Sequence, residues 1–159
     1  EVDLPQTLLK EMDIAIASMH TPCYEGEKTT EKITQAYLKV MENEYVDIIG
    51  HPDDGRFPAD YKELAKAAKR THTLLEVNNS SLRPTGFRVN TQENCLKMLK
   101  ACKEEGAMIV LGSDSHVDVD IANCQYAAEL VKKADFPEEL VANSSLEKLK
   151  ASLKRNKKV

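Results

Sequence analysis

Short apolar runs alternate with longer amphipathic stretches along the chain. Each run is rich in Ile, Val, Leu or Ala and is only five to seven residues long, which is typical of a strand buried in a parallel sheet. The pattern therefore predicts four strands, at residues 13–19, 46–50, 73–77 and 107–112.

The stretches between these runs carry apolar residues at helical spacing. Ile33, Tyr37 and Val40, for example, would lie on one face of a helix. Helices are therefore predicted at about 30–44, 58–70, 91–105, 120–133 and 144–154.

Residues near the ends of these stretches suggest where the helices begin and end. Thr91 is a suitable N-cap, Pro58 suits a first helical turn, and Gly106 suits a C-cap. His72 is expected at a helix end, where its positive charge would suit the helix dipole. The basic run at 154–158 is expected to be a solvated, fraying helix end.

The alternation of strand and helix predicts βαβ units and a mainly parallel sheet, because such a unit takes about 30 residues or more. No linker or low-complexity segment interrupts residues 1–159. The expected fold class is therefore α/β, in a single domain.

Composition narrows the classes of function. The 159 residues include 26 acidic and 22 basic side chains, and the net charge of −4 disfavours a nucleic-acid binder. No apolar run approaches the roughly 20 residues of a membrane span, and the opening residues do not resemble a signal peptide. The four cysteines form no C-x-x-C pair, so reduced thiols in the cytoplasm are expected.

Three of the four histidines directly follow predicted strands. His20, His51 and His116 therefore belong at the carboxyl ends of strands, where α/β proteins gather reactive groups. Asp114 and His116 are two residues apart and would point to the same side of an extended segment. Imidazole and carboxylate together suit zinc, manganese or iron, so this set predicts a metal site rather than separate capping or core residues.

Other candidate residues leave more than one interpretation open. Cys23 is a weaker candidate for a soft metal ligand. Glu76, inside a predicted strand, could be a catalytic acid, an orienting group or a satisfied structural one. The loop arginines Arg56, Arg83 and Arg88 could bind a phosphate ester or be solvated loop charges.

Four motifs carry a family resemblance. They are Met19-His20-Thr21-Pro22, Gly50-His51-Pro52, Leu75-Glu76-Val77-Asn78-Asn79-Ser80-Ser81 and Leu111-Gly112-Ser113-Asp114-Ser115-His116. In order and spacing they resemble the later motifs of the PHP (polymerase and histidinol phosphatase) superfamily, and most nearly its YcdX-type bacterial phosphatases.

The resemblance implies a distorted barrel of seven β/α units that hydrolyses small phosphate esters. A cluster of divalent ions would lie at the strand ends, with zinc expected and manganese, iron or magnesium as alternatives. The implied metal ligands are His20, His51, Asp114 and His116. Asp114, His116 and Glu76 are the expected catalytic groups, and Asn78 and the three loop arginines are the expected substrate-binding groups.

The early motifs of that superfamily have no counterpart in this chain. An H-x-H, a further His and a later Glu are missing, and only about four β/α units are predicted. The chain is therefore expected to be the C-terminal portion of a PHP domain, with roughly 100 residues absent at about 30 per unit. The open sheet edge would need a partner, either the missing N-terminal segment or another copy of the chain.

The expected mechanism is hydrolysis by a metal-activated water. Two alternatives remain open. The first is a metallohydrolase that acts on C–N bonds, as amidohydrolase-like barrels do, although the loop arginines favour phosphate. The second is a metal-binding but inactive interaction module, which the missing early ligands favour.

Overall fold

The computed structural model describes residues 2–157, which form an α/β fold on one parallel sheet. The strands lie in chain order, β1-β2-β3-β4, and each neighbouring pair is parallel. This order is consistent with a partial barrel wall, and it confirms the predicted fold class. Three strands are shorter than predicted: β1 (Ile16–Ser18), β2 (Ile48–Gly50) and β4 (Ile109–Gly112). The other, β3 (Leu74–Asn78), has the predicted length but begins one residue later.

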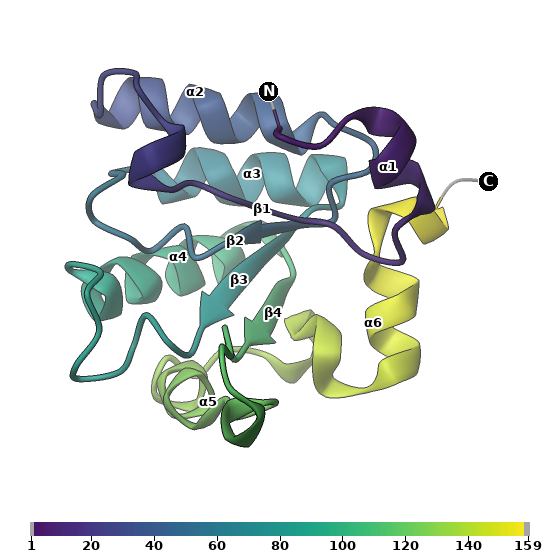
Figure 1. The fold of residues 1–159 in the computed structure, drawn as a ribbon. Helices are drawn as coiled ribbons and strands as arrows, with labels where there is room; N and C mark the ends of the chain where they lie inside the picture. The colour runs from purple at the N-terminus through teal and green to yellow at the C-terminus, as the bar shows by residue number, and fades with distance from the viewer. Residues whose placement is uncertain (1, 158–159) are drawn as a thin grey trace.

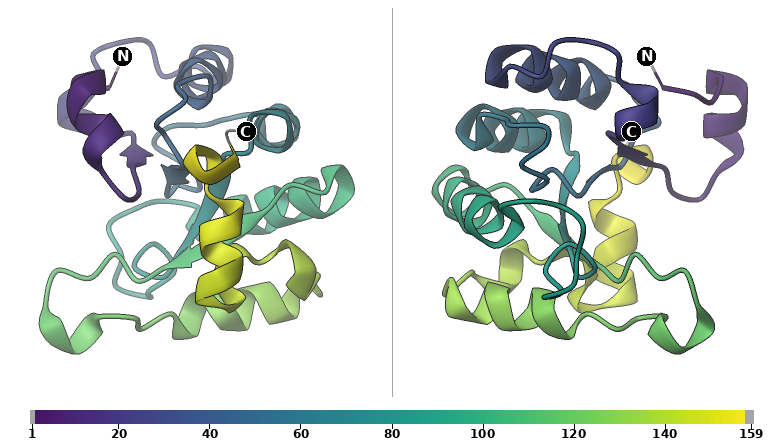
Figure 2. Two further views of the ribbon diagram at one scale, coloured as in Figure 1. Left: turned by 90° about the vertical axis from the view of Figure 1, so that its right-hand side faces the viewer. Right: turned by 60° about the vertical axis from the view of Figure 1, so that its left-hand side comes forward.

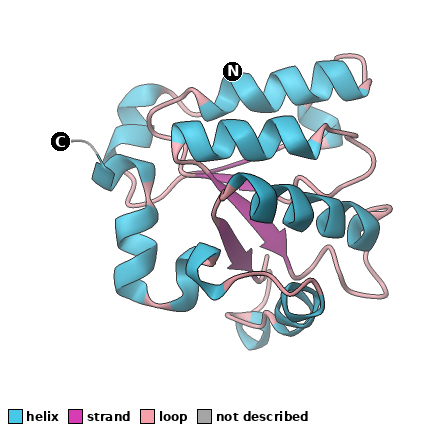
Figure 3. Cartoon of the chain, turned by 180° about the vertical axis from the view of Figure 1, so that it is seen from behind, coloured by secondary structure: helices cyan, strands magenta, loops and turns pink. Residues whose placement is uncertain are grey.

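Six α-helices accompany the sheet within the described residues. Figures 1 and 3 show α2, α3 and α4 side by side on one face of the sheet, whereas Figure 2 shows α6 on the opposite side. The helices are α1 (Gln6–Glu11), α2 (Thr30–Met41), α3 (Tyr61–Thr71), α4 (Thr91–Glu105), α5 (Gln125–Lys133) and α6 (Leu146–Ser152). None of these helices has the length and apolar character needed to cross a bilayer.

Alternate residues of each strand face different layers. Ile49 and Leu75 are fully buried in the larger core cluster, which the helices α2, α3 and α4 share. Ile48 and Leu74 belong instead to a smaller cluster on the side of α6. Because side chains alternate along a strand, Glu76, two residues beyond Leu74, also belongs to the α6 side.

The edge strand β1 pairs only with β2 among the described strands. Ile16 is 55% exposed on this edge. A groove of about 760 Å³ runs between the N-terminal segment, β1 and α2, and its lining includes Leu4, Ala17, His20 and Tyr37. Folded proteins commonly cover an open sheet edge of this kind.

The helix predicted at 58–70 begins later than expected. It starts at Tyr61 rather than near Pro58, because the Asp60 carboxylate accepts hydrogen bonds from the N–H groups of Lys62 and Glu63. An aspartate in this position satisfies backbone donors that the first turn leaves unpaired.

Two further helix starts differ from the prediction. Asn90, rather than Thr91, is the N-cap of α4, and its backbone is left-handed with φ of 55°. The next predicted helix begins only at Gln125, because a separate 3-10 turn, Asp118–Asp120, precedes it. Polar residues in the segment before Gln125 therefore form a loop rather than the first turns of a helix.

Both residues that were expected at helix ends are C-caps. Gly106 ends α4 with φ of 70°, and His72 ends α3 with φ of 57°. The charge predicted for His72 is wrong, however. Burial lowers the pKa of this imidazole, and the nearby charges of Lys157 and Lys154 lower it further, so the neutral form is favoured.

The C-terminal segment is anchored, which corrects the expectation of a fraying end. Within the final turn, Lys154–Lys157, Arg155 donates through Nη2 and Nε to Oδ2 of the buried Asp47, at 2.6 and 2.8 Å. The same guanidinium donates to the backbone carbonyl of Met12. Figure 1 accordingly shows the turn Lys154–Lys157 beside α1. Lys158, the last residue of the basic run, lies outside the described residues.

Candidate active site

His20 and His51 meet at the carboxyl ends of β1 and β2. The strands pair in a register that sets Ser18 opposite Gly50, so the residues that follow them emerge together. The two imidazole rings contact edge to face, with centroids 4.9 Å apart. Burial lowers the pKa of His51 to about 4, and the charges of Arg88 and His20 act in the same direction. His51 is therefore neutral at pH 7, the form that binds metal ions.

Glu76 contacts this histidine pair from β3. Its Oε2 accepts the backbone N–H of His51 at 2.8 Å and the side-chain amide of Asn78 at 3.1 Å. Burial raises the pKa of Glu76, whereas these two hydrogen bonds lower it. Gly112 of β4 leaves room for the carboxylate, since a Cβ there would lie 2.9 Å from Glu76 Cδ. The end of β2, the Glu76 side chain of β3 and Gly112 of β4 therefore pack closely together.

Two candidate residues leave their strands through left-handed backbone. His51 has φ of 32° and Asp114 has φ of 50°. Non-glycine residues seldom adopt this conformation, and such strain concentrates at functional sites. The turn at Asp114 also breaks the extended geometry that would align it with His116. The His116 side chain is 85% exposed, with Nδ1 3.0 Å from the carbonyl oxygen of Asp114.

Only some of the candidate metal ligands lie close to one another. Among residues 2–157, no three His, Cys, Asp or Glu side chains approach closely enough to form a complete metal site. The donor chemistry nevertheless fits a divalent ion, because Nδ1 of His51 is buried and has no hydrogen-bond partner among residues 2–157. His20 and His51 would supply two of the four ligands that zinc takes, and the charge of Asp114 acts on His51.

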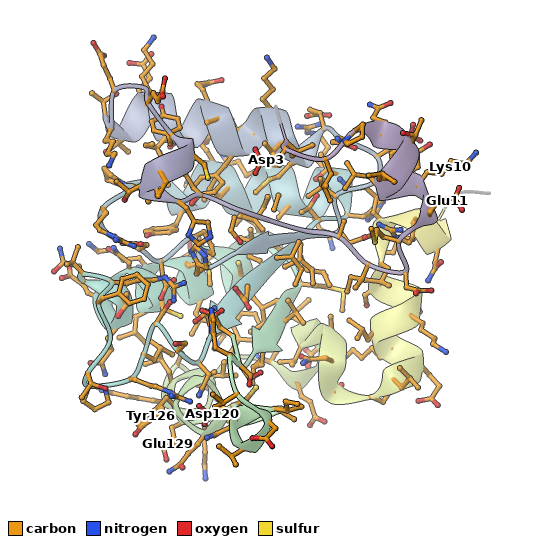
Figure 4. All side chains as sticks on the ribbon, in the orientation of Figure 1. Asp3, Lys10, Glu11, Asp120, Tyr126 and Glu129 are labelled. Carbon is orange, nitrogen blue, oxygen red and sulfur yellow. The ribbon has the colours of Figure 1, made fainter. Side chains whose placement is uncertain are left out.

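Two of the arginines expected to bind phosphate are partly exposed, and each is paired with a carboxylate. Arg56 contacts Asp54 at 2.6 Å, and Arg83 contacts Asp120 at 2.9 Å. Figure 4 shows Asp120 near the lower edge of the view. A phosphate ester would have to compete with these carboxylates for the guanidinium groups.

Asp53 and Asp54, which follow His51-Pro52, lie beside the site but are not among the residues that the sequence analysis singles out. Asp54 is buried; burial acts to raise its pKa, but hydrogen bonds from Arg56 lower the pKa overall. Asp53 is fully buried, and neither of its carboxylate oxygens has a partner in hydrogen-bond geometry among the described residues. Burial raises the pKa of Asp53 to about 7. The sequence does contain one signal for Asp54: Arg56, two residues further along the chain, is a suitable ion-pair partner for it.

Replacing Asp53 with asparagine is expected to stabilise the chain at pH 8 and to have little effect at pH 5. The pKa of Asp53 is about 7 in the fold, against about 4 when unfolded. The folded chain therefore binds the extra proton between these values, and its stability falls as pH rises from about 4 to about 7. Asparagine cannot ionise, so we expect a gain of about 1–2 kcal/mol at pH 8.

Urea unfolding of the metal-free chain at both pH values measures this effect. Asp135→Asn is the matched control, because Asp135 has a fully exposed side chain and a left-handed backbone that asparagine tolerates. Equal effects of Asp53→Asn at pH 5 and pH 8 would contradict the assignment.

Curated bacterial proteins resemble this chain along nearly all of it. A probable phosphatase of Clostridium novyi is 42% identical over 158 residues, which are 99% of this chain and 64% of that protein. A probable phosphatase of Thermoanaerobacter sp. (strain X514) is 40% identical over 157 residues, or 63% of its length. The chain thus spans less than two thirds of these relatives. No protein-family model matches it.

A solved structure shares the fold. Histidinol phosphate phosphatase from Lactococcus lactis, crystallised with zinc, L-histidinol and phosphate, superposes with a TM-score of 0.59 at 20% identity. The match covers 83% of this chain and 61% of that protein. In sequence, therefore, this chain is similar to proteins named probable phosphatases, and in fold it is similar to a histidinol phosphate phosphatase.

Proposed function

We propose that this chain is part of a metal-dependent phosphatase of the PHP superfamily, of YcdX type, which hydrolyses small phosphate esters. The observation that carries the proposal is the contact of His20 with the buried, neutral His51 at the strand ends. The names of the relatives support a phosphatase, and the zinc in the Lactococcus lactis enzyme supports a divalent metal.

The proposed metal ligands are His20, His51, Asp114 and His116. A bound divalent ion would supply hydroxide near neutral pH and would offset charge on the phosphoryl oxygens. Glu76 holds the backbone of His51 in position through its N–H. His116 would deliver a proton to the leaving oxygen from the ring nitrogen that does not hold the ion, and its exposed position suits exchange of that proton with water.

The substrate side of the proposal involves Asn78 and the loop arginines. Arg56, Arg83 and Arg88 lie in loops above the strand ends, and each already holds a carboxylate in an ion pair. Guanidinium groups bind phosphate oxygens in the same forked geometry as carboxylates, so exchange of one anion for the other is chemically direct.

We also propose that the chain supplies about four β/α units from the C-terminal portion of a larger barrel. Its relatives extend well beyond the matched region, and β1 leaves a groove of about 760 Å³ along its outer edge. The expected occupant of that edge is the remaining part of the barrel, or a second copy of the chain. Free thiols at all four cysteines are compatible with a cytoplasmic location.

The test combines metal analysis with hydrolysis of p-nitrophenyl phosphate by the full chain, with and without Zn²⁺ or Mn²⁺. We expect metal-dependent hydrolysis, and we expect His51→Ala to lower metal affinity and rate by at least about tenfold. His72→Asn is the control, because it removes another histidine in left-handed backbone at the opposite end of the sheet.

Normal metal binding and hydrolysis by His51→Ala would contradict the proposal. Hydrolysis that survives complete removal of metal would contradict it as well. Metal binding without hydrolysis of any phosphate ester would instead favour the inactive binding module.

A further inference from the structure

Arg88 is a buried cation inside the candidate site. Its side chain is only 5% exposed, and Nη2 donates to Oδ2 of Asp114 at 3.1 Å. Nη1 donates to the Ser81 hydroxyl at 3.2 Å and lies 3.4 Å from Oδ1 of Asn78. Nε lies 3.9 Å from a carboxylate oxygen of Asp54. The guanidinium is therefore held from several sides, and one of its partners is a proposed metal ligand.

The other two loop arginines do not share this position. The side chains of Arg56 and Arg83 are 32% and 31% exposed, and their partners Asp54 and Asp120 are not proposed ligands. Only Arg88 places its positive charge against the proposed metal site, where it also acts on His51. The charge of a buried guanidinium is screened less by solvent than that of an exposed one, so its effect on neighbouring charges is larger.

We infer that Arg88 is a tethered counter-cation of Asp114, and that a divalent metal must displace it to bind. The inference rests on the proposed function, because it takes Asp114 as a metal ligand. Arg88 already holds Oδ2 of Asp114, so a metal ion and the guanidinium would compete for this carboxylate and repel one another. Arg88 therefore weakens metal binding, and metal binding loosens the Arg88–Asp114 pair by the same free energy.

This competition has a consequence for the order of binding. Once the metal holds Asp114, Nη2 of Arg88 is released while Nη1 still has Ser81 and Asn78 as partners. The freed edge of the guanidinium then remains at the strand ends and can donate hydrogen bonds to the oxygens of a phosphoryl group. Metal binding would precede productive binding of the substrate, because it frees the group that receives the phosphate.

A purely structural role predicts the opposite effect of mutation. If Arg88 only stiffens its loop, Arg88→Gln disorders the residues around Asp114 and weakens metal binding. If Arg88 competes with the metal, the same substitution strengthens metal binding. The sign of the change in metal affinity therefore separates the two roles.

The experiment measures Co²⁺ and Zn²⁺ affinity of the full chain by calorimetry and by the visible absorption of bound Co²⁺. We expect Arg88→Gln to bind either ion about tenfold more tightly than the unmodified chain. Arg88→Lys, which retains the charge, is expected to stay close to the unmodified chain. Arg83→Gln is the matched control, because its partner Asp120 lies outside the proposed ligand set, and we expect no change in metal affinity.

A second measurement uses the unmodified chain and does not depend on how the variants fold. The Nε–H resonance of Arg88 is followed by NMR while Zn²⁺ is added, and a shift that saturates with the metal is expected. Equal or weaker metal binding by Arg88→Gln, or an unchanged resonance at saturating Zn²⁺, overturns the inference and leaves the proposed function standing. If neither the unmodified chain nor any variant binds Co²⁺ or Zn²⁺, both the inference and the proposed function are overturned.

Discussion

Replacing Arg155 with methionine is expected to lower the free energy of unfolding by about 3–5 kcal/mol. Arg155 is the cation that neutralises Asp47, which is fully buried between β1 and β2 and also accepts the Ala15 N–H at 3.0 Å. Methionine retains the apolar stem but leaves the buried carboxylate without its positive partner. The backbone carbonyls of Tyr45 and Met12 lose a donor as well.

Urea unfolding of the Arg155→Met variant measures this effect. Arg70→Met is the matched control, because Arg70 pairs with Glu42 in an exposed ion pair and should change stability little. Adding Asp47→Asn to Arg155→Met should recover part of the loss, since the variant would then bury no unpaired charge. Equal small effects of Arg155→Met and Arg70→Met would show that the C-terminal turn is not an anchor.

The anchoring of the C-terminal turn was beyond the reach of local sequence patterns. A basic run at a chain end usually remains solvated, and nothing near Arg155 in sequence offers it a partner. Asp47 is 108 residues away and directly precedes a buried strand. Such a pairing depends on how β1 and β2 pack, which apolar periodicity does not describe.

The overall architecture was predictable for a physical reason. Strands buried on both faces must be apolar throughout, and helices that cover them must be apolar on one face only. These two patterns alternate clearly, so the parallel sheet and its helix layer follow. The exact helix starts do not follow, because capping by Asp60 or a left-handed Asn90 depends on backbone geometry that periodicity leaves undefined.

The candidate site was predictable only where it depends on strand order. His20 and His51 follow adjacent strands and do meet. The position of His116 depends instead on the left-handed turn at Asp114, which extended-strand alternation cannot anticipate. The burial of Asp53 was hidden for a related reason, since a Pro-Asp-Asp-Gly segment is ordinarily an exposed turn.

Replacing Gly112 with alanine is expected to lower the free energy of unfolding by about 2–3 kcal/mol and to disturb the candidate site. The new Cβ would overlap Glu76 Oε1, and Glu76 has little freedom to move. Its other oxygen accepts hydrogen bonds from His51 and Asn78, and the side chain is buried. Moving the carboxylate would leave the N–H of His51, in its strained left-handed conformation, without an acceptor.

A double-mutant cycle distinguishes this clash from a general defect of β4. Glu76→Ala removes the overlapping atoms, so adding Gly112→Ala to it should cost much less than Gly112→Ala alone. Gly26→Ala is the control, because the Cβ at that position meets only the far end of the Tyr24 side chain, away from the candidate site. Additive effects of Glu76→Ala and Gly112→Ala would mean that the glycine serves the strand itself. A coupling of 1 kcal/mol or more, on the order found for residues in contact, would mean that Gly112 is required by the carboxylate that holds His51.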